Sequence, residues 1–487
     1  MWSAIQSVLK QIDDFVWGVP LMVLILSGGL LLTVRLGLLQ VRKLGLALKW
    51  MVQNEEEGEG EISSFAALCT ALSATIGTGN IVGVATAVCA GGPGALFWMI
   101  VAAFLGMATK YSEGLLAVKY RVVDESGHSL GGLFYYIEKG MGKKWKWLAK
   151  IFAFFGACVG LFGIGTFSQV NGISSAVVGF FDPDKSFAVT IPGLGTYSWV
   201  VVIASLVLTF CVAAVIIGGV KRIASVSQVV VPFMAIIYFI FALALVLFNI
   251  KEVPQAIVTI VQAAFNPKAV TGGVVGSMLV AMQNGVARGI FSNEAGLGSA
   301  PIAAAAAQTK EPVRQGLVSM TGTFIDTIVI CTLTGLSVVI TGAWQVEGLE
   351  GVQVTTYAFQ NGLPFSNQFC AAVLMICLVF FAFTTILGWD YYGERCLEYL
   401  TGKDEKKIKI YRWLYILAVF IGPYMTVAAV WTIADIFNGL MALPNMIALF
   451  ALSSVVVKET KRFFDVYADQ KMANKKSSAS IKDAAEN

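Results

Sequence analysis

The sequence predicts an all-α membrane protein that crosses the bilayer many times. Of its 487 residues, 57% are hydrophobic and only 13% are charged, whereas soluble domains have about 25% charged residues. Apolar runs of about 20 residues, the length that spans a bilayer as a helix, recur along the chain. The longest uncharged stretch, Ile62 to Thr109, is long enough for two spans. Because the bilayer core offers backbone groups no partner, these runs must be helical.

Eleven apolar runs are expected to form spans. A short interfacial helix over Met1 to Asp14 precedes the first span, at 15–34. The long uncharged stretch supplies two spans, and the second of them begins near Pro93 and ends around Lys119. The others are expected at 148–181, 197–219, 223–250, 272–308, 316–341, 365–399, 413–434 and 436–457. This predicts three regions: an N-terminal part with the extra span and a cytoplasmic loop (1–62), a ten-helix core (63–457) and a polar cytoplasmic tail (458–487).

The basic residues predict the orientation of the chain. Nearly all of the 34 Lys and Arg residues fall in loops on one side of the membrane or in the tail. The exceptions are Lys10, Lys185, Lys251, Lys268 and Arg288. We therefore expect a multi-pass cell-membrane protein with its N-terminus outside and its C-terminus in the cytoplasm, the tail being disordered beyond Ala473. Because the charge is spread over loops, a nucleic-acid partner is not expected.

Cysteine and histidine give no sign of a catalytic centre. None of the eight cysteines forms a C-x-x-C pair, so neither a zinc site nor a redox pair is indicated. The only histidine, His128, lies in a polar loop and is expected to be solvated. An intramembrane enzyme would need a catalytic constellation within the spans, and none is apparent. We therefore expect a protein that is not an enzyme and has no cofactor.

The first core span contains an interruption. Residues Thr75 to Gly83 read TIGTGNIVG, and the central four, Gly77 to Asn80, are poor helix formers. Unwound backbone at membrane depth is tolerated only where it faces protein or a wet cavity, so the break is a candidate binding site. The alternative to a binding site is that Gly79-x-x-x-Gly83 is a surface of small residues on which a neighbouring helix packs closely. A dinucleotide loop is excluded because Val82 occupies the third glycine position.

A second interruption is expected in the span at 272–308. It is placed at Gln283-Asn284-Gly285, and the irregular stretch RGIFSNEAGLG follows from Arg288 to Gly298. The two breaks lie five spans apart and therefore enter from opposite faces of the membrane. Broken helices at matching places in two five-helix halves of opposite orientation indicate a transporter built as an inverted repeat.

Three blocks of the sequence resemble the alanine or glycine:cation symporter family, also called sodium:alanine symporters. They are ATIGTGNIVGV (74–84), GGPGALFWMIVAAFLG (91–106) and GIFSNEAGLGSAP (289–301). One departure is Ile100, where the family usually has a second tryptophan. The resemblance implies a leucine-transporter-like 5+5 inverted repeat with one extra N-terminal span. It also implies symport of small amino acids, chiefly alanine and glycine, with sodium.

The residues at the breaks suit a zwitterionic amino acid. The backbone N–H groups of Thr78, Gly79 and Asn80, at the positive end of a half-helix, suit a carboxylate. The Asn80 oxygen, or carbonyls freed near Gln283 and Asn284, suit an ammonium group.

Further contacts are expected from other spans. Gln169 is a polar residue in an apolar helix, and the family resemblance implies that it binds substrate; a hydrogen bond between helices is the alternative. Phe167, Ile173 and Trp389 are candidates for a cramped apolar wall that would select a small substrate.

The pair Thr384-Thr385 is the candidate for the cation. Two adjacent hydroxyls can join carbonyls of the broken helix in an oxygen shell that suits a hard cation. In the fold that the resemblance implies, such a pair contributes to a sodium site, and the carbonyls would come from Ser73 and Ile76. The alternative is that both threonines bond only to their own helix.

Charged residues inside spans are functional candidates by default. Asp326 and Arg288 are expected to be neutralised locally near a gating region, and a direct pair between them is one way to achieve this. Glu294 is expected to act as a gate or helix cap closer to the cytoplasm. Glu113, Asp390, Glu394 and Asp435 are instead expected to be solvated near the interfaces. Together these features predict sodium-coupled uptake of alanine and glycine by alternating access. Proton coupling, larger neutral amino acids and a passive channel remain alternatives, and the sequence leaves the oligomeric state open.

Overall fold

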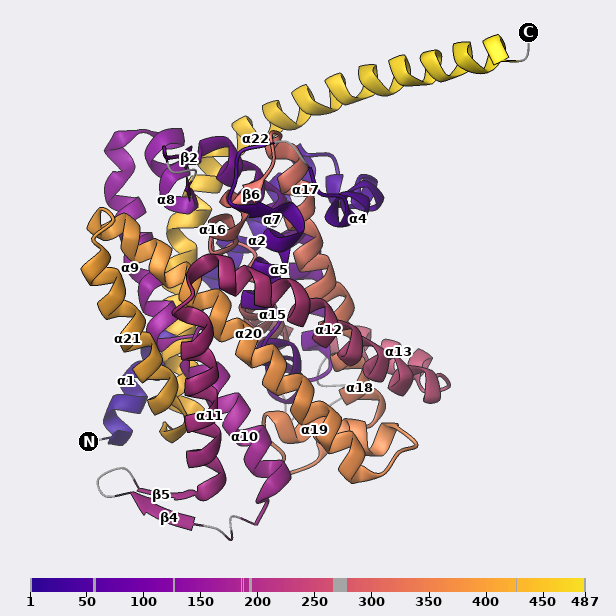
Figure 1. Cartoon of the computed structure of the whole chain (residues 1–487). Coiled ribbons are helices and arrows are strands. Elements are labelled where there is room, and N and C mark those ends of the chain that lie inside the picture. The colour runs from indigo at the N-terminus through magenta and orange to yellow at the C-terminus, as the bar shows by residue number, and fades with distance from the viewer. Residues whose placement is uncertain are drawn as a thin grey trace.

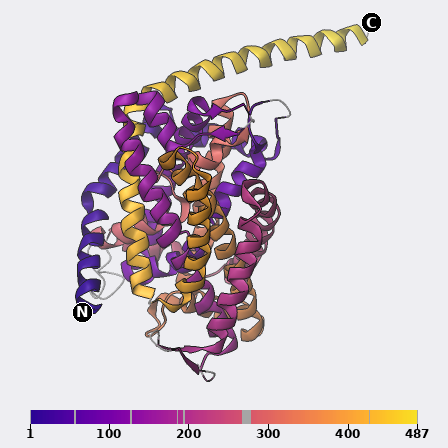
Figure 2. The same cartoon turned by 60° about the vertical axis from the view of Figure 1, so that its left-hand side comes forward.

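The computed structural model is a bundle of helices with the two termini at opposite ends (Figures 1 and 2). It describes residues 2–55, 58–125, 128–184, 186, 188–191, 195–265, 278–425 and 427–485. Met1, Lys185, Lys268, the expected start of one span (272–277) and the last two residues therefore lie outside the described residues. Within them, seven helices are long and apolar enough to cross a membrane, or eight if the bent pair Ser64–Thr75 and Gly79–Gly91 is one span. The protein is thus a multi-pass membrane protein, and eleven spans remain a prediction.

The first half of the chain begins with α1, a helix at the place where an interfacial helix is predicted, and α1 packs on the C-terminal helix. The helices in chain order are α1 (Trp2–Val16), α2 (Val19–Arg35), α3 (Leu39–Arg42), α4 (Leu44–Val52), α5 (Ser64–Thr75), the π-helix η1 (Gly79–Gly83), α6 (Val84–Gly91), α7 (Gly94–Tyr120), α8 (Leu133–Tyr136), η2 (Ile137–Met141), η3 (Lys143–Trp145), α9 (Lys146–Phe162), α10 (Phe167–Phe181), α11 (Trp199–Ile216) and α12 (Gly219–Phe248).

The second half contains α13 (Val253–Phe265), α15 (Met278–Asn293), α16 (Ala300–Ala305), α17 (Pro312–Thr323), the π-helix η4 (Phe324–Cys331), α18 (Thr332–Ile340), η5 (Ala343–Gln345), α19 (Val352–Gly362), α20 (Asn367–Thr401), α21 (Glu405–Ile421), η6 (Gly422–Tyr424) and α22 (Val427–Ala485). Near the centre, α7 packs along α15 and α17, while α20 packs against α5, α9 and α10. These contacts bring both broken segments beside α7 and α20.

Three pairs of short strands lie at the two ends of the bundle (Figure 1). Antiparallel hairpins pair β2 (Val122–Val123) with β3 (Ser129–Leu130), and β4 (Ala188–Ile191) with β5 (Gly195–Ser198). The parallel pair β1 (Ile62–Ser63) and β6 (Ala307–Gln308) joins the segments next to the two broken helices. Arg121 reinforces this pair because its guanidinium donates to the carbonyls of Glu59, Ala305, Ala307 and Thr309.

Three expected spans have different bounds in the structure. The span at 148–181 is divided into α9 and α10 by a break at 163–166. The boundary expected between 434 and 436 is wrong, because α21 ends at Ile421 and α22 already begins at Val427. Gly422-Pro423 supplies the turn, since proline cannot continue the hydrogen-bond ladder of the preceding helix. The helix α21 begins at Glu405, before the expected start at 413, because its first residues are charged and do not belong to the apolar run.

The tail also differs from expectation. Instead of becoming disordered beyond Ala473, α22 continues to Ala485 and projects away from the bundle (Figure 1). This segment is rich in Lys and Ala, which have high helix propensity. The expected border between core and tail at 457–458 falls inside this continuous helix.

Candidate functional site

The first predicted break is present in the structure. The helix α5 ends at Thr75, η1 starts at Gly79, and the two halves are bent by 51°. Ile76 has an extended ψ of 94°, so the helical ladder stops at this residue. The wider π-helical turn of η1 then leads into α6, and such turns occur often at functional sites.

Side chains accept hydrogen bonds from the backbone N–H groups that the break leaves without helical acceptors. The Gly77 N–H donates to Asn80 Oδ1 at 2.9 Å, and the Thr78 N–H donates to Gln169 Oε1 at 3.0 Å. The Gln169 amide nitrogen in turn donates to the Ile164 carbonyl at 3.0 Å, in the break between α9 and α10. The hydroxyl of Thr78 is buried and has no hydrogen-bond partner within the described chain. The break therefore contains a free polar atom and amides held by exchangeable side-chain partners.

The helix α20 lies directly against this break. Thr385 Oγ1 donates to the Ile76 carbonyl at 3.2 Å and to Phe381 O at 3.0 Å. Its neighbour Thr384 bonds within α20, to Phe380 O and Phe381 O, and contacts a methionine sulfur. The close approach requires glycine at Gly77, where a Cβ would lie 2.5 Å from Thr385 Oγ1 and 2.9 Å from Gln169 Oε1.

Ser73 faces the same helix. A Cβ on Gly388 would lie 2.8 Å from Ser73 Oγ, so these two elements touch at this point also. In the structure Ser73 Oγ donates to Thr70 O at 2.7 Å. The oxygens of Ser73, Ile76 and Thr385 are therefore gathered where α5 ends and α20 crosses it.

Asp326 forms a polar cluster on the other side of the break. It lies in η4, has no exposed surface, and accepts hydrogen bonds from Asn80 Nδ2 (2.7 Å), Ser292 Oγ (2.9 Å) and Thr327 Oγ1 (2.6 Å). Asn293 Nδ2 donates to Thr327 Oγ1 at 3.0 Å. This carboxylate thus connects the first break, the end of α15 and η4.

The second break lies elsewhere than expected. Gln283, Asn284 and Gly285 belong to the regular helix α15, and Asn284 Nδ2 donates to Val280 O at 2.9 Å. Gly285 allows close helix packing, because a Cβ there would be 2.2 Å from the Ala95 carbonyl oxygen. The helix instead ends at Asn293, and α16 begins at Ala300. Left-handed backbone at Glu294 (φ 56°), Gly296 and Gly298 produces this break.

Two buried acidic side chains, Glu294 and Glu113, form hydrogen bonds at the second break. Glu294 accepts hydrogen bonds from Trp389 Nε1 at 2.8 Å and from Ser299 Oγ at 2.6 Å. Glu113 Oε1 accepts from the Gly296 N–H at 3.1 Å and from Asn445 Nδ2 at 2.6 Å. Glu294 therefore connects the break to α20 through side-chain hydrogen bonds, and its predicted role as a gate or helix cap stays a prediction.

The predicted Arg288–Asp326 pair is wrong. Arg288 forms a two-point ion pair with Asp435, at 3.0 and 2.7 Å, while Asp326 has the partners given above. Three acids expected in solvent are buried, namely Glu113, Asp390 and Asp435. Glu394 is paired with Arg412. Hydropathy could not place these acids because it does not show which face of a helix meets its neighbours.

An open cavity of about 610 Å³ approaches the first break from the end of the bundle that holds α19. Val82, Asn171, Gly172 and residues of α19 line it. Gly172 also packs on Thr78, since a Cβ there would lie 2.5 Å from Thr78 Cγ2. The cavity therefore ends beside the broken segment.

The three residues predicted to form an apolar wall lie in different surroundings. Phe167 lines an apolar cavity next to α1, and Ile173 lines an apolar groove between α10, α11 and α20. The Trp389 indole is buried and bonded to Glu294. A wall made jointly by these three remains a prediction.

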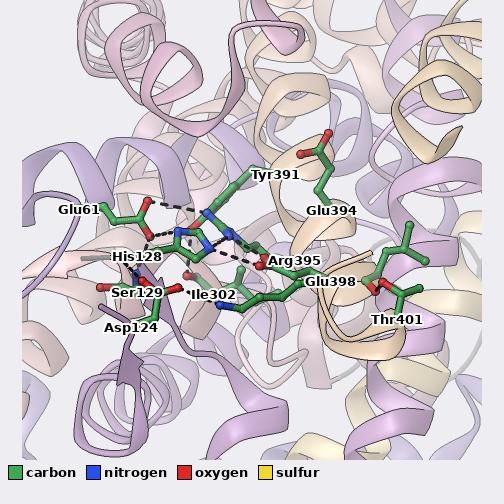
Figure 3. A network of polar contacts seen from close by, with 12 residues as sticks. Glu61, Asp124, His128, Ser129, Ile302, Tyr391, Glu394, Arg395, Glu398 and Thr401 are labelled. Atoms are coloured by element: carbon green, nitrogen blue, oxygen red, sulfur yellow. Dashed lines mark hydrogen bonds and ion pairs between the residues drawn. The ribbon is translucent and has the colours of Figure 1, made fainter. Parts of the chain in front are cut away.

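His128 belongs to an ionic cluster and is not simply solvated (Figure 3). His128 Nδ1 lies 3.0 Å from Glu61 Oε1, and Nε2 lies 3.3 Å from Glu398 Oε1. Arg395 contacts His128 and bonds to Glu398 at 2.7 Å. Hydrogen bonds to Glu398 and Glu61 raise the pKa of His128 to about 9, against an opposing effect of desolvation. The cluster joins the segment before α5 to the end of α20.

Sequence reasoning missed Ser292, Thr327 and Glu113. A signal existed for the first two: a carboxylate inside a span requires partners, and short hydroxyl side chains beside a break can supply them. Glu113 lies near the end of an apolar run, where its burial could not be distinguished from exposure.

Comparisons with known proteins agree with this architecture. A family model described as the sodium:alanine symporter family matches residues 2–479. The chain is 47% identical over 467 residues to the sodium/alanine symporter AgcS of Methanococcus maripaludis, covering 94% of this chain and 97% of that protein. It is 37% identical over 482 residues to the probable sodium/glutamine symporter GlnT of Bacillus subtilis, covering 98% and 93%.

Among solved structures, MhsT in complex with L-phenylalanine superposes with a TM-score of 0.55, covering 82% of this chain and 98% of that one. At 11% identity this likeness shows a shared leucine-transporter-like fold alone. The extent of the family match shows that the chain belongs to the sodium:alanine symporter family of membrane transporters.

Proposed function

We propose that this transporter couples inward sodium movement to uptake of alanine and glycine by alternating access. The observation that carries the proposal is the hydrogen bond from Thr385 to the Ile76 carbonyl. It brings a hydroxyl of α20 to the released backbone of the first break, next to the polar groups that suit an amino acid. A cation and a substrate bound so close together can favour the same occluded state, which is what coupling requires.

The substrate side of the proposal rests on three groups at the break. The Thr78 N–H is held by the Gln169 side chain and the Gly77 N–H by Asn80. A substrate carboxylate can replace these side-chain acceptors, because an ionised acceptor forms stronger hydrogen bonds than an amide oxygen does. The free Thr78 hydroxyl supplies one more polar contact. Packing of Gly77, Gly79 and Gly172 against neighbouring atoms leaves little space, which favours a small side chain.

The cation side rests on an oxygen-only donor set. The Ser73 and Ile76 carbonyls and the two threonine hydroxyls are hard oxygen ligands, and such ligands suit a hard cation. We propose Ser73, Ile76, Thr384 and Thr385 as its ligands, with sodium as the transported ion. The names of the two relatives, which both include sodium, support this choice.

Radiolabelled alanine uptake into proteoliposomes tests the function. We expect concentrative uptake that depends on an inward sodium gradient and is competed by glycine more strongly than by glutamine. Uptake that is driven by a proton gradient in the absence of sodium would show that the coupled ion is the proton and not sodium. Strong competition by glutamine would show that the protein accepts larger neutral amino acids as well. Equilibration of alanine across the membrane without accumulation would indicate a passive channel.

The direction of transport depends on the orientation of the chain. We propose that the N-terminal end of the bundle, with α19 and the open cavity, faces outside and that α22 ends in the cytoplasm. Cysteine accessibility in intact cells tests this, with a single cysteine placed either in the β4–β5 hairpin or in the tail beyond Ala473, in a background without the eight native cysteines.

A further inference from the structure

Two aspartates are fully buried in the helix bundle, and their surroundings differ sharply. Asp326 accepts hydrogen bonds from three side chains, those of Asn80, Ser292 and Thr327. Asp390 also has no exposed surface, yet neither of its carboxyl oxygens has a hydrogen-bond partner among the described residues. Hydrogen bonds stabilise the ionised form of a carboxyl, and burial without them disfavours it.

Two tyrosine hydroxyls that interact electrostatically with Asp390 are engaged in hydrogen bonds elsewhere. Tyr411 and Tyr415 of α21 lie within electrostatic range of Asp390. Tyr411 donates to the Ala157 carbonyl at 2.9 Å, and Tyr415 donates to the Ile386 carbonyl at 2.7 Å. Tyr415 also lies within hydrogen-bond distance of the Gly165 carbonyl, at 2.9 Å, so both phenols have backbone carbonyls as their acceptors.

The nearest cation is engaged as well. Arg412 of α21 holds Glu394 with two hydrogen bonds, at 2.5 and 2.8 Å. Glu394 lies one helical turn from Asp390 on α20, so its negative charge offsets the attraction of Arg412 for Asp390. The other titratable groups near Tyr411 are the thiols Cys158 of α9 and Cys396 of α20. An ionised Asp390 would thus be an uncompensated charge in a buried site, which is strongly unfavourable.

We propose that Asp390 is a proton-binding site of the transport core, occupied in this structure, and that Glu394 is the outlet for its proton. In the transfer, which one water molecule must bridge because the two carboxyl groups are not hydrogen-bonded to each other, the O–H bond of Asp390 breaks and an O–H bond forms on Glu394. The total charge stays constant, and Arg412 becomes free to pair with the Asp390 carboxylate. Glu394 is partly exposed, at 16% of its side chain, and can release the proton to water.

The site is connected to the transport machinery through α20. Asp390 follows Trp389, which bonds to Glu294 in the second break, and it lies five residues beyond Thr385. Tyr415 bonds to the Ile386 carbonyl, between Thr385 and Asp390 in the sequence. A change of charge at Asp390 therefore acts on the same helix that carries the proposed cation ligand. Only this connection rests on the proposed function.

Infrared difference spectroscopy tests proton occupancy in the purified full-length protein, without alanine or sodium. We expect the wild-type minus D390N spectrum at neutral pH to contain the carbonyl band of a carboxylic acid, shifted in D₂O. The corresponding D326N spectrum should contain carboxylate bands instead. Carboxylate bands in the D390N comparison would overturn the proposal, whatever the transported substrate proves to be.

Two further measurements complete the test. If D390N does not fold, wild-type protein labelled with ¹³C at the aspartate carboxyls should still show a protonated aspartate at neutral pH, and its absence would contradict the proposal. The double variant E394Q/R412Q removes both charges together and so creates no new unpaired ion. It should slow hydrogen–deuterium exchange of the Asp390 band by at least about tenfold. Unchanged exchange would eliminate Glu394 as the outlet.

Discussion

Asn80 and Asp326 meet across the first broken helix, where the Asn80 amide donates to the Asp326 carboxylate at 2.7 Å. The same asparagine accepts the Gly77 N–H at 2.9 Å. One side chain therefore connects the released backbone of the break to a buried charge on η4. We expect D326N to lower alanine uptake by about tenfold or more, because a hydrogen bond to a charged group contributes roughly 1.5–3 kcal/mol. Normal uptake in folded D326N would show that the charge is dispensable.

Arg288 and Asp435 form an ion pair in which Asp435 is buried and the Arg288 side chain is 18% exposed. R288A leaves the buried Asp435 carboxylate without this cation and should lower the free energy of unfolding by about 3–5 kcal/mol. The swap R288D/D435R should recover much of this loss. Thermal unfolding measures both effects. The control is K146A, which removes the half-exposed Lys146–Glu138 pair and should change stability by less than about 1 kcal/mol.

Thr384 and Thr385 offer a matched pair for the cation site. Only Thr385 bonds to the broken helix in this structure, whereas the hydroxyl of Thr384 has its carbonyl partners within α20. T385V should therefore raise the sodium concentration needed for half-maximal uptake, by about tenfold if one ligand contributes about 1.4 kcal/mol. T384V should raise it less. An equal shift in both variants would mean that Thr384 turns toward the ion when sodium binds.

Gly77 tests the packing of the break. In G77A the new methyl group would overlap Thr385 Oγ1 and approach Gln169 Oε1, so we expect loss of at least about nine-tenths of uptake, a cost above roughly 1.4 kcal/mol. G83A is the control, because a Cβ at Gly83 meets no atom within 4 Å. Uptake is measured at matched protein levels. Similar uptake by the two variants would contradict the contact.

His128 predicts a pH dependence of stability. Its pKa is raised from 6.5 to about 9 by hydrogen bonds to Glu398 and Glu61. Because the folded value is above the unfolded value, the stabilisation is complete below about pH 6.5 and is lost as the pH rises through about 9. The melting temperature of the wild type should fall over this range, and that of H128Q should fall less. Parallel curves would exclude His128 as the cause.

The sequence predicted the membrane class and the first break because both depend on local composition. Charge-free runs and the cluster Gly77 to Asn80 leave the chain few alternatives. The second break was misplaced because Gly285 and the Gly296–Gly298 segment look equally disruptive in sequence. In the structure Gly285 packs against Ala95 within a regular helix, whereas Glu113 and Glu294 form hydrogen bonds with the segment that is broken.

The charged partners were unpredictable for a related reason. Arg288 lies in α15 and Asp435 in α22, and their pairing depends on how two distant helices cross. Hydropathy reports how apolar a span is but not which neighbour each face meets. That Asn80 would need polar partners was easier to predict, because an amide inside an apolar span requires them wherever the span lies; its binding of substrate stays a prediction.

The β1–β6 ladder and the Arg121 clamp have a mechanical consequence. They tie the half-helices α5 and α16 to each other, so we expect these two helices to move together in any conformational change. Movement of this unit relative to α20 would have to break the ionic contacts of Glu61 and His128 with Arg395 and Glu398.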